Sequence, residues 1–160
     1  MDNAPQSTFR ARYQAGLNDF EYCASLHLEH SALDPAVITQ ALHLEPEHSH
    51  FAGEPRRTPK GRSREGVYPS GYWFAKLEVV DGENLEQFLW RVLQRVEPIR
   101  ELLASITNDN GNAECFVGLF ATGLCDQSLS AKLLVEFGQR GIDLRLDYYP
   151  SKAKDDSREE

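Results

Sequence analysis

Apolar and polar residues alternate along three stretches of the chain, as they do in a β-strand that buries one face. These stretches are residues 20–28, 72–80 and 142–149. A fourth stretch, residues 114–121, is apolar or small at nearly every position, so a strand formed there has two apolar faces. We therefore expect residues 114–121 to form a central strand, with the three one-sided strands placed around it.

Two short helices are predicted from apolar residues that recur every three or four positions. The first begins at Asp34 and Pro35, where the Asp carboxylate can accept free backbone N–H groups and Pro loses no hydrogen bond. Pro46 marks its end. The second includes residues 129–137 and is expected to end near Gly141.

The longest helical pattern runs from residue 85 to residue 106. Asn84 and Gln87 have the spacing of a capping box, in which each side chain binds the backbone N–H of the other residue. Pro98 interrupts the pattern, because it has no N–H to donate inside a helix. We expect a kink, or a break into two helices, near Val96.

Residues 48–71 differ in composition from the rest of the chain, being rich in Gly, Pro and Arg. Their first part, residues 49–55, can form a short edge strand. From Arg56 onward, Pro and Gly predict an exposed loop. With that edge strand, the order of elements up to residue 121 is strand, helix, strand, strand, helix, strand.

This order predicts an α+β fold with a ferredoxin-like split βαβ core and an appended C-terminal helix and strand. Right-handed crossovers place the helices on one face of a mixed four- to five-stranded sheet and leave the other face open. Without the strand at residues 49–55, an all-parallel doubly wound sheet is the alternative. We prefer the first fold because the main strands alternate in polarity, as strands with one solvent face do.

The 160 residues, 41% of them hydrophobic and 26% charged, suit one globular domain. We expect this domain to cover residues 19–150, between a flexible N-terminal segment (1–18) and a disordered tail (151–160). No run approaches the roughly 20 apolar residues of a membrane span. The first residues also lack the apolar core of a secretory signal, which predicts a cytoplasmic protein. The formal charge of −8 opposes binding to duplex nucleic acid or to an anionic membrane.

Several short motifs follow one another with a recognisable order and spacing. They are Leu33-Asp34-Pro35, Leu44-Glu45-Pro46, Gly53-Glu54 with following arginines, Gly71-Tyr72-Trp73, a Leu-rich helix ending near Leu103, and Leu146-Asp147-Tyr148-Tyr149. In these motifs the chain, from about Phe20 to Pro150, resembles the mainly bacterial family of domains of unknown function 4279. The resemblance implies a compact domain and supplies no activity.

The candidate binding residues are a basic cluster together with aromatic and basic side chains of the strands. Arginine side chains on an exposed segment suit phosphate or carboxylate groups, and neighbouring aromatic rings suit stacking or a protein partner. The predicted binding residues are Arg56, Arg57, Lys60, Arg62, Arg64, Tyr72, Trp73, Lys76, Arg145 and Tyr149. A solvated loop is the competing interpretation of the basic cluster.

Neither a metal site nor a catalytic site is predicted. His48 and His50 form an H-x-H pair, and His27 and His30 are the other candidate ligands nearby, but no Cys or carboxylate spacing completes a recognisable set. Cys23 and His27 lie four positions apart on one strand, roughly 13 Å along it, which is too far for a nucleophile and its base. No known nucleophile or nucleotide-binding motif occurs, so we expect no enzyme activity and no cofactor.

The sequence therefore favours a non-catalytic binding domain that uses the open sheet face and the Arg-rich segment. A protein partner is the first expectation, as for an inhibitor or an immunity-type protein. An anion- or nucleotide-sensing domain is the alternative.

Overall fold

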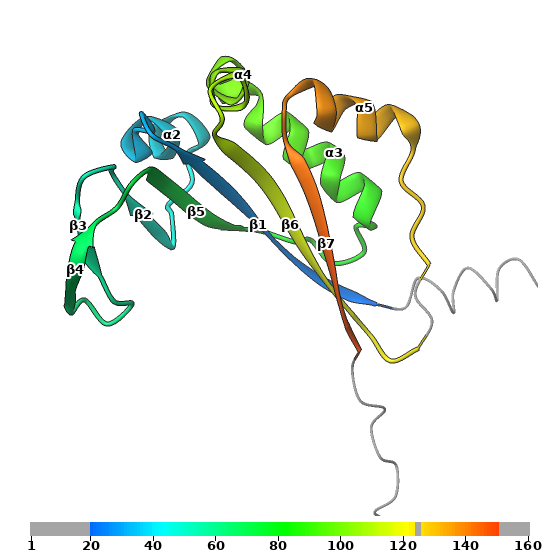
Figure 1. The fold of residues 1–160 in the computed structure, drawn as a ribbon. Helices are drawn as coiled ribbons and strands as arrows, with labels where there is room; N and C mark the ends of the chain where they lie inside the picture. The colour runs from blue at the N-terminus through cyan, green and yellow to red at the C-terminus, as the bar shows by residue number, and fades with distance from the viewer. Residues whose placement is uncertain (1–19, 124–125, 151–160) are drawn as a thin grey trace, which may run out of the picture.

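The computed structural model describes residues 20–123 and 126–150, which form an α+β fold built on a five-stranded sheet. Figure 1 shows the sheet with its helices on one face. Its strands, in spatial order, are β2 (His48–His50), β5 (Gly71–Leu77), β1 (Glu21–His30), β6 (Asn112–Ala121) and β7 (Asp143–Pro150). The sheet is mixed, because β6 and β7 are parallel and the other three pairings are antiparallel. The predicted α+β class and the mixed sheet are confirmed.

Strand β1 occupies the middle of the sheet, with two strands on each side. The crossover from β1 to β2 therefore spans β5, and the crossover from β5 to β6 spans β1. Strand β6, which we expected to be central, is paired on both sides but lies one position from the β7 edge. Its two apolar faces agree with an internal strand, whereas the alternation of β1 reflects one covered and one uncovered face.

Local sequence signals predict where the first two helices begin, but two other bounds differ from the prediction. The first helix ends at Leu42, before Pro46, and the last begins at Ala131, after Leu129. The helices are α2 (Pro35–Leu42), α3 (Leu85–Val96), the 3-10 turn η1 (Glu97–Ile99), α4 (Arg100–Asn108) and α5 (Ala131–Gln139). Asp34 caps α2 by accepting a 2.9 Å hydrogen bond from Ala36 N–H. Asn84 and Gln87 form the reciprocal capping box of α3. Because Pro98 cannot donate a helical hydrogen bond, α3 stops at Val96 and α4 starts after η1.

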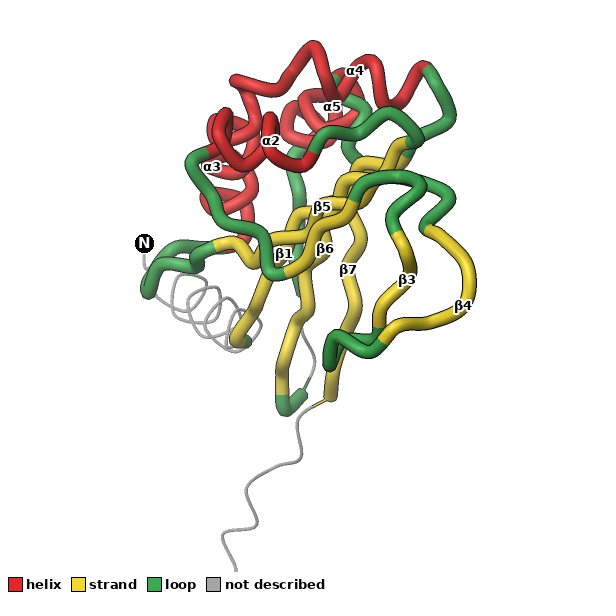
Figure 2. The backbone as a smooth tube through the Cα atoms, turned by 90° about the vertical axis from the view of Figure 1, so that its left-hand side faces the viewer, coloured by secondary structure: helices red, strands yellow, loops and turns green. Residues whose placement is uncertain are grey.

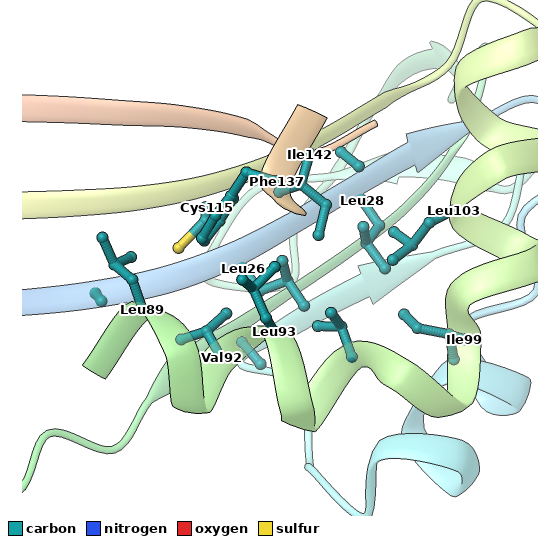
Figure 3. Packing of buried hydrophobic residues seen from close by; sticks show 14 of the residues in the cluster. Leu26, Leu28, Leu89, Val92, Leu93, Ile99, Leu103, Cys115, Phe137 and Ile142 are labelled. Atoms are coloured by element: carbon teal, nitrogen blue, oxygen red, sulfur yellow. The ribbon is translucent and has the colours of Figure 1, made fainter. Parts of the chain in front are cut away.

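The core lies between the sheet and these helices. Figure 3 shows Leu26 and Leu28 of β1 pointing toward Leu93 of α3 and Leu103 of α4. All four side chains are buried. The burial of such apolar side chains is the main favourable term in folding. It also determines which face of each strand points away from the helices.

Residues 55–67 form a two-stranded β-hairpin separate from the main sheet, whereas the sequence predicted an exposed loop from Arg56 onward. Its strands are β3 (Pro55–Arg57) and β4 (Ser63–Val67). Pro55 is the first residue of its strand, where Pro is tolerated, and Gly61 has φ +78°, which a turn requires and Gly adopts without strain. The hairpin projects from the β2–β5 edge, away from the helices (Figure 2).

An edge strand is present as β2, but it overlaps the predicted residues 49–55 only at Ser49 and His50, and Pro55 belongs to β3. The predictions for residues 1–18 and 151–160 concern parts of the chain outside the described residues. Among the described helices, none has the length and the apolar character needed to cross a membrane.

Candidate binding face

The side chains that point away from the helices form what we call the open face. Strand register sets its composition, since one row across the sheet consists of His48, Phe74, His27, Glu114 and Asp143. Successive side chains of a strand alternate between faces, so every second residue from these positions also lies on the open face.

Rings from four strands, and that of Tyr68 between β4 and β5, meet on this face in an aromatic cluster. Its members are His27, His48, His50, Tyr68, Tyr72, Phe74 and Phe116. The rings of His27 and Phe74 lie 4.7 Å apart between centroids, and those of His27 and Phe116 lie 6.4 Å apart. Most of these side chains are only half-buried, which places an apolar surface in contact with solvent beside polar ring atoms.

His27 connects the cluster through two hydrogen bonds. Its Nε2 is 2.8 Å from Ser25 Oγ, and its Nδ1 is 3.0 Å from the Tyr72 hydroxyl. A neutral imidazole satisfies both partners, because one ring nitrogen donates and the other accepts. Burial lowers the pKa of His27, and this effect outweighs the opposite influence of the Glu114 carboxylate. The ring is therefore held in its neutral form at neutral pH.

Ser25 and His27 have the contact of a nucleophile and its base, but the position of Ser25 opposes that role. Ser25 is only 6% exposed, in the middle strand of the sheet. A nucleophile must reach a substrate atom, so we interpret this hydrogen bond as a way to orient His27 toward Tyr72.

The H-x-H pair lies at the β2 edge of the cluster. His50 Nδ1 and His48 Nε2 are 3.3 Å apart, and the His50 ring stacks on Tyr68 at 3.5 Å between centroids. Burial lowers the pKa of His50, and the neighbouring His48 adds to this effect. Within the described residues, no group of three or more His, Cys, Asp or Glu side chains is arranged to hold a metal ion.

The hairpin carries the predicted basic cluster. Arg56 and Arg57 lie on β3, Lys60 and Arg62 in the turn, and Arg64 on β4. All five side chains are exposed to solvent. None of the five forms an ion pair with another described residue. Residues 55–67 contain only one acidic side chain, Glu65, so the hairpin is a cationic projection on an acidic protein.

Tyr68 joins the cationic hairpin to the aromatic cluster. Its hydroxyl accepts a 3.2 Å hydrogen bond from Arg57 N–H and lies 3.3 Å from the Arg57 carbonyl, to which it donates. Its ring meanwhile stacks on His50. The hairpin is thereby attached to the sheet edge by a side chain as well as by the backbone.

The structure corrects one predicted binding residue and places the others on two parts of the surface. Trp73 is fully buried on the helix side of β5, where its Nε1 donates a 3.0 Å hydrogen bond to Thr39 Oγ1. Its neighbour Tyr72 lies on the open face, because adjacent residues of a strand point in opposite directions. Trp73 was predicted to be a binding residue because it is aromatic, but its position in the strand register places it in the core.

Lys76, Arg145 and Tyr149 also lie on the open face, away from the hairpin. Lys76 pairs with Glu47 at 3.4 Å, and Arg145 pairs with Asp147 at 3.1 Å. The Tyr149 ring stacks on Phe120 at 5.1 Å between centroids. Each of these three residues therefore already has a partner within the chain.

Sequence reasoning did not include Phe116 and Phe120 in the site. Both are open-face residues of β6, partnered by Ser25 and Glu21 of β1. The available signal was the apolar character of both faces of residues 114–121, because one of those faces had to be turned away from the helices.

Two cavities lie away from the hairpin. One, of about 520 Å³, is bordered by Thr39, Ser49 and Phe51, and the other, of about 530 Å³, by Tyr22 and Glu83. Neither is lined by a basic residue of the hairpin. Neither is lined by a member of the aromatic cluster either.

Comparison with protein families matches residues 20–151 to a domain of unknown function (DUF4279), which confirms the resemblance seen in the sequence motifs. No curated protein and no solved structure matches the chain.

Proposed function

We propose that this chain, which belongs to the DUF4279 family, is a non-catalytic domain that binds a protein partner on its open face. The observation that carries the proposal is the cationic hairpin beside the half-exposed aromatic cluster. Five basic side chains without an acidic partner among the described residues leave their charge available to carboxylates of another molecule.

The chemistry of the two parts suggests the kind of partner. Aromatic and Arg side chains are the usual anchors of protein interfaces. We infer an acidic segment that lies across the aromatic cluster and pairs with Arg56 and Arg57. An inhibitor or immunity-type protein of the bacterial cytoplasm acts through such a complex.

The test is affinity capture from the native host with three versions of the chain. One is unchanged, one carries Arg56→Gln and Arg57→Gln on the hairpin, and a control matched in charge carries Arg100→Gln and Lys132→Gln on the helices. The unchanged chain and the control should retain the same stoichiometric protein, and the hairpin variant should lose it. Retention should weaken as salt is raised, because exposed charge pairs are screened.

Two results would reject this proposal. One is that the unchanged chain retains no stoichiometric protein. The other is that the hairpin variant retains the protein as well as the control does.

An anion- or nucleotide-sensing domain is the second candidate. The flat stack of His50 and Tyr68 beside Arg57 is the observation in its favour, since a base can stack on a ring while its phosphate pairs with a guanidinium group. A nucleoside triphosphate should then raise the melting temperature of the unchanged chain, and Arg56→Ala with Arg57→Ala should abolish the increase.

A further inference from the structure

Strand β7 has the features of a surface that pairs with another strand. It is eight residues long, it ends the sheet, and no described strand pairs with its outer edge. The opposite edge is the three-residue β2, which offers little backbone for pairing. A long uncovered edge strand presents a row of N–H and C=O groups to any strand that approaches it.

The side chains of β7 add apolar surface to this edge. Leu146 is 42% exposed, Tyr148 49% and Tyr149 43%. Leu134 and Val135, on the neighbouring helix α5, are also exposed. Half of the ten large hydrophobic side chains exposed in the described residues therefore belong to α5 and β7.

The order of residues along β7 is self-complementary about Leu146. If a second copy of β7 runs antiparallel with Leu146 opposite Leu146, then Arg145 lies opposite Asp147 of the second copy, and Asp147 lies opposite Arg145 of the second copy. In the same register Leu144 lies opposite Tyr148. Directly opposed side chains of an antiparallel pair are close enough for ion pairs and apolar contacts.

We propose that the chain forms a symmetric dimer in which the two β7 strands pair antiparallel and the two sheets become one. The two-fold axis passes beside Leu146, as in other dimers in which the same patch meets itself. Arg145 and Asp147 already pair within each copy at 3.1 Å, so the dimer brings together four charges of alternating sign. The two open faces then lie on the same side of a continuous sheet.

The test uses charge reversal and measures molar mass by light scattering across a wide range of protein concentration. The unchanged chain should be dimeric. Arg145→Asp places two pairs of carboxylates opposite each other, and Asp147→Arg places two pairs of guanidinium groups opposite each other. Each single variant should weaken dimerisation by at least about tenfold, since two favourable cross-strand pairs become repulsive.

Two further samples test the register itself. The double variant Arg145→Asp with Asp147→Arg restores opposite charges across the axis and should dimerise again. An equimolar mixture of the two single variants should form a heterodimer, because each supplies the charges that the other lacks. Arg145 is exposed and Asp147 is half-buried, and circular dichroism checks that every variant remains folded.

The proposal is overturned if the unchanged chain is monomeric at every concentration, if the single variants dimerise as well as the unchanged chain, or if neither the double variant nor the mixture dimerises. Hydrogen exchange of the unchanged chain provides an independent measurement that needs no variant. Amides of β7 should become more protected as the concentration rises, and unchanged protection would reject the pairing. The hairpin variant described above should still dimerise, so failure of the binding proposal and failure of this one are distinguishable.

Discussion

His30 and Asp109 join two segments that lie 79 residues apart, through a 3.1 Å contact between His30 Nε2 and Asp109 Oδ2. His30 Nδ1 accepts a hydrogen bond from Ala32 N–H, so the ring proton is on Nε2 and is donated to the carboxylate. His30 is buried, whereas Asp109 is largely exposed. The end of β1 is thereby attached to the turn between α4 and β6.

Replacing His30 should cost more stability than replacing its partner. His30→Ala removes two hydrogen bonds and leaves a cavity, which should lower the free energy of unfolding by about 2 to 3 kcal/mol. Asp109→Ala leaves the imidazole in place and should cost about 1 kcal/mol or less. Urea unfolding of both variants measures the difference, and equal losses would contradict the structural role assigned to His30.

Gly111 and Gly138 should respond to alanine in opposite directions. A Cβ at Gly111 would lie 2.6 Å from Ile106 Cγ2 and 2.7 Å from the Glu29 carbonyl oxygen, and the backbone atom cannot move aside. We expect Gly111→Ala to destabilise the chain by about 1 to 3 kcal/mol.

Gly138 is the matched control. It lies in α5 with no atom within 4 Å of the added Cβ, so Gly138→Ala should stabilise the helix by about 0.5 to 1 kcal/mol. Thermal unfolding compares the two variants. A neutral effect at Gly111 would mean that the turn before β6 is looser than its contacts indicate.

Local signals in the sequence were sufficient where neighbouring residues determine the structure. Asp34 caps α2, Asn84 and Gln87 form their capping box, and Pro98 separates α3 from α4, because each of these effects acts within one helical turn. The membership of the open face was also predictable in part, since alternation assigns His27 and Tyr72 to the polar sides of their strands.

The site required information that neighbouring residues do not carry. The contact between His27 and Tyr72 joins strands 45 residues apart, and the pairing of β1 with β6 brings Phe116 beside Ser25. Only the register of the assembled sheet creates these contacts. The hairpin was missed for a different reason, because Gly61 signals both a loop and the turn of a hairpin.

The ion pair between Glu83 and Arg91 should make stability depend on pH. Arg91 donates to both carboxylate oxygens, at 2.8 and 2.7 Å, and these hydrogen bonds lower the pKa of Glu83. Because the pKa of Glu83 is lower in the folded chain than in the unfolded chain, the ion pair contributes fully to the free energy of unfolding above the unfolded-state pKa. This contribution is lost as pH falls through the folded-state pKa.

Glu83→Gln should therefore cost about 1 kcal/mol or somewhat more at pH 7, and the difference from the unchanged chain should shrink as the solution is acidified below about pH 4.5. Chemical unfolding of both proteins at a series of pH values measures this difference in the free energy of unfolding. Glu65→Gln on the hairpin is the control, because Glu65 has no ion-pair partner among the described residues. A difference that stays constant with pH would show that the carboxylate charge is not the source of the stabilisation.

Burial in the aromatic cluster is the main cause that lowers the pKa of His27. The unfolded chain then binds a proton more readily than the folded chain, so stability should fall as pH decreases from about 7 through the ordinary histidine pKa of about 6.5 and down to the folded-state value. Nuclear magnetic resonance of the imidazole carbons follows this titration directly. His27→Gln keeps hydrogen-bonding groups near Ser25 and Tyr72 without a titrating ring, and it should reduce the pH dependence of unfolding in the same interval. A midpoint for His27 at or above 6.5 would mean that the ring is better solvated, or closer to Glu114, than its contacts with Phe74 and Phe116 indicate.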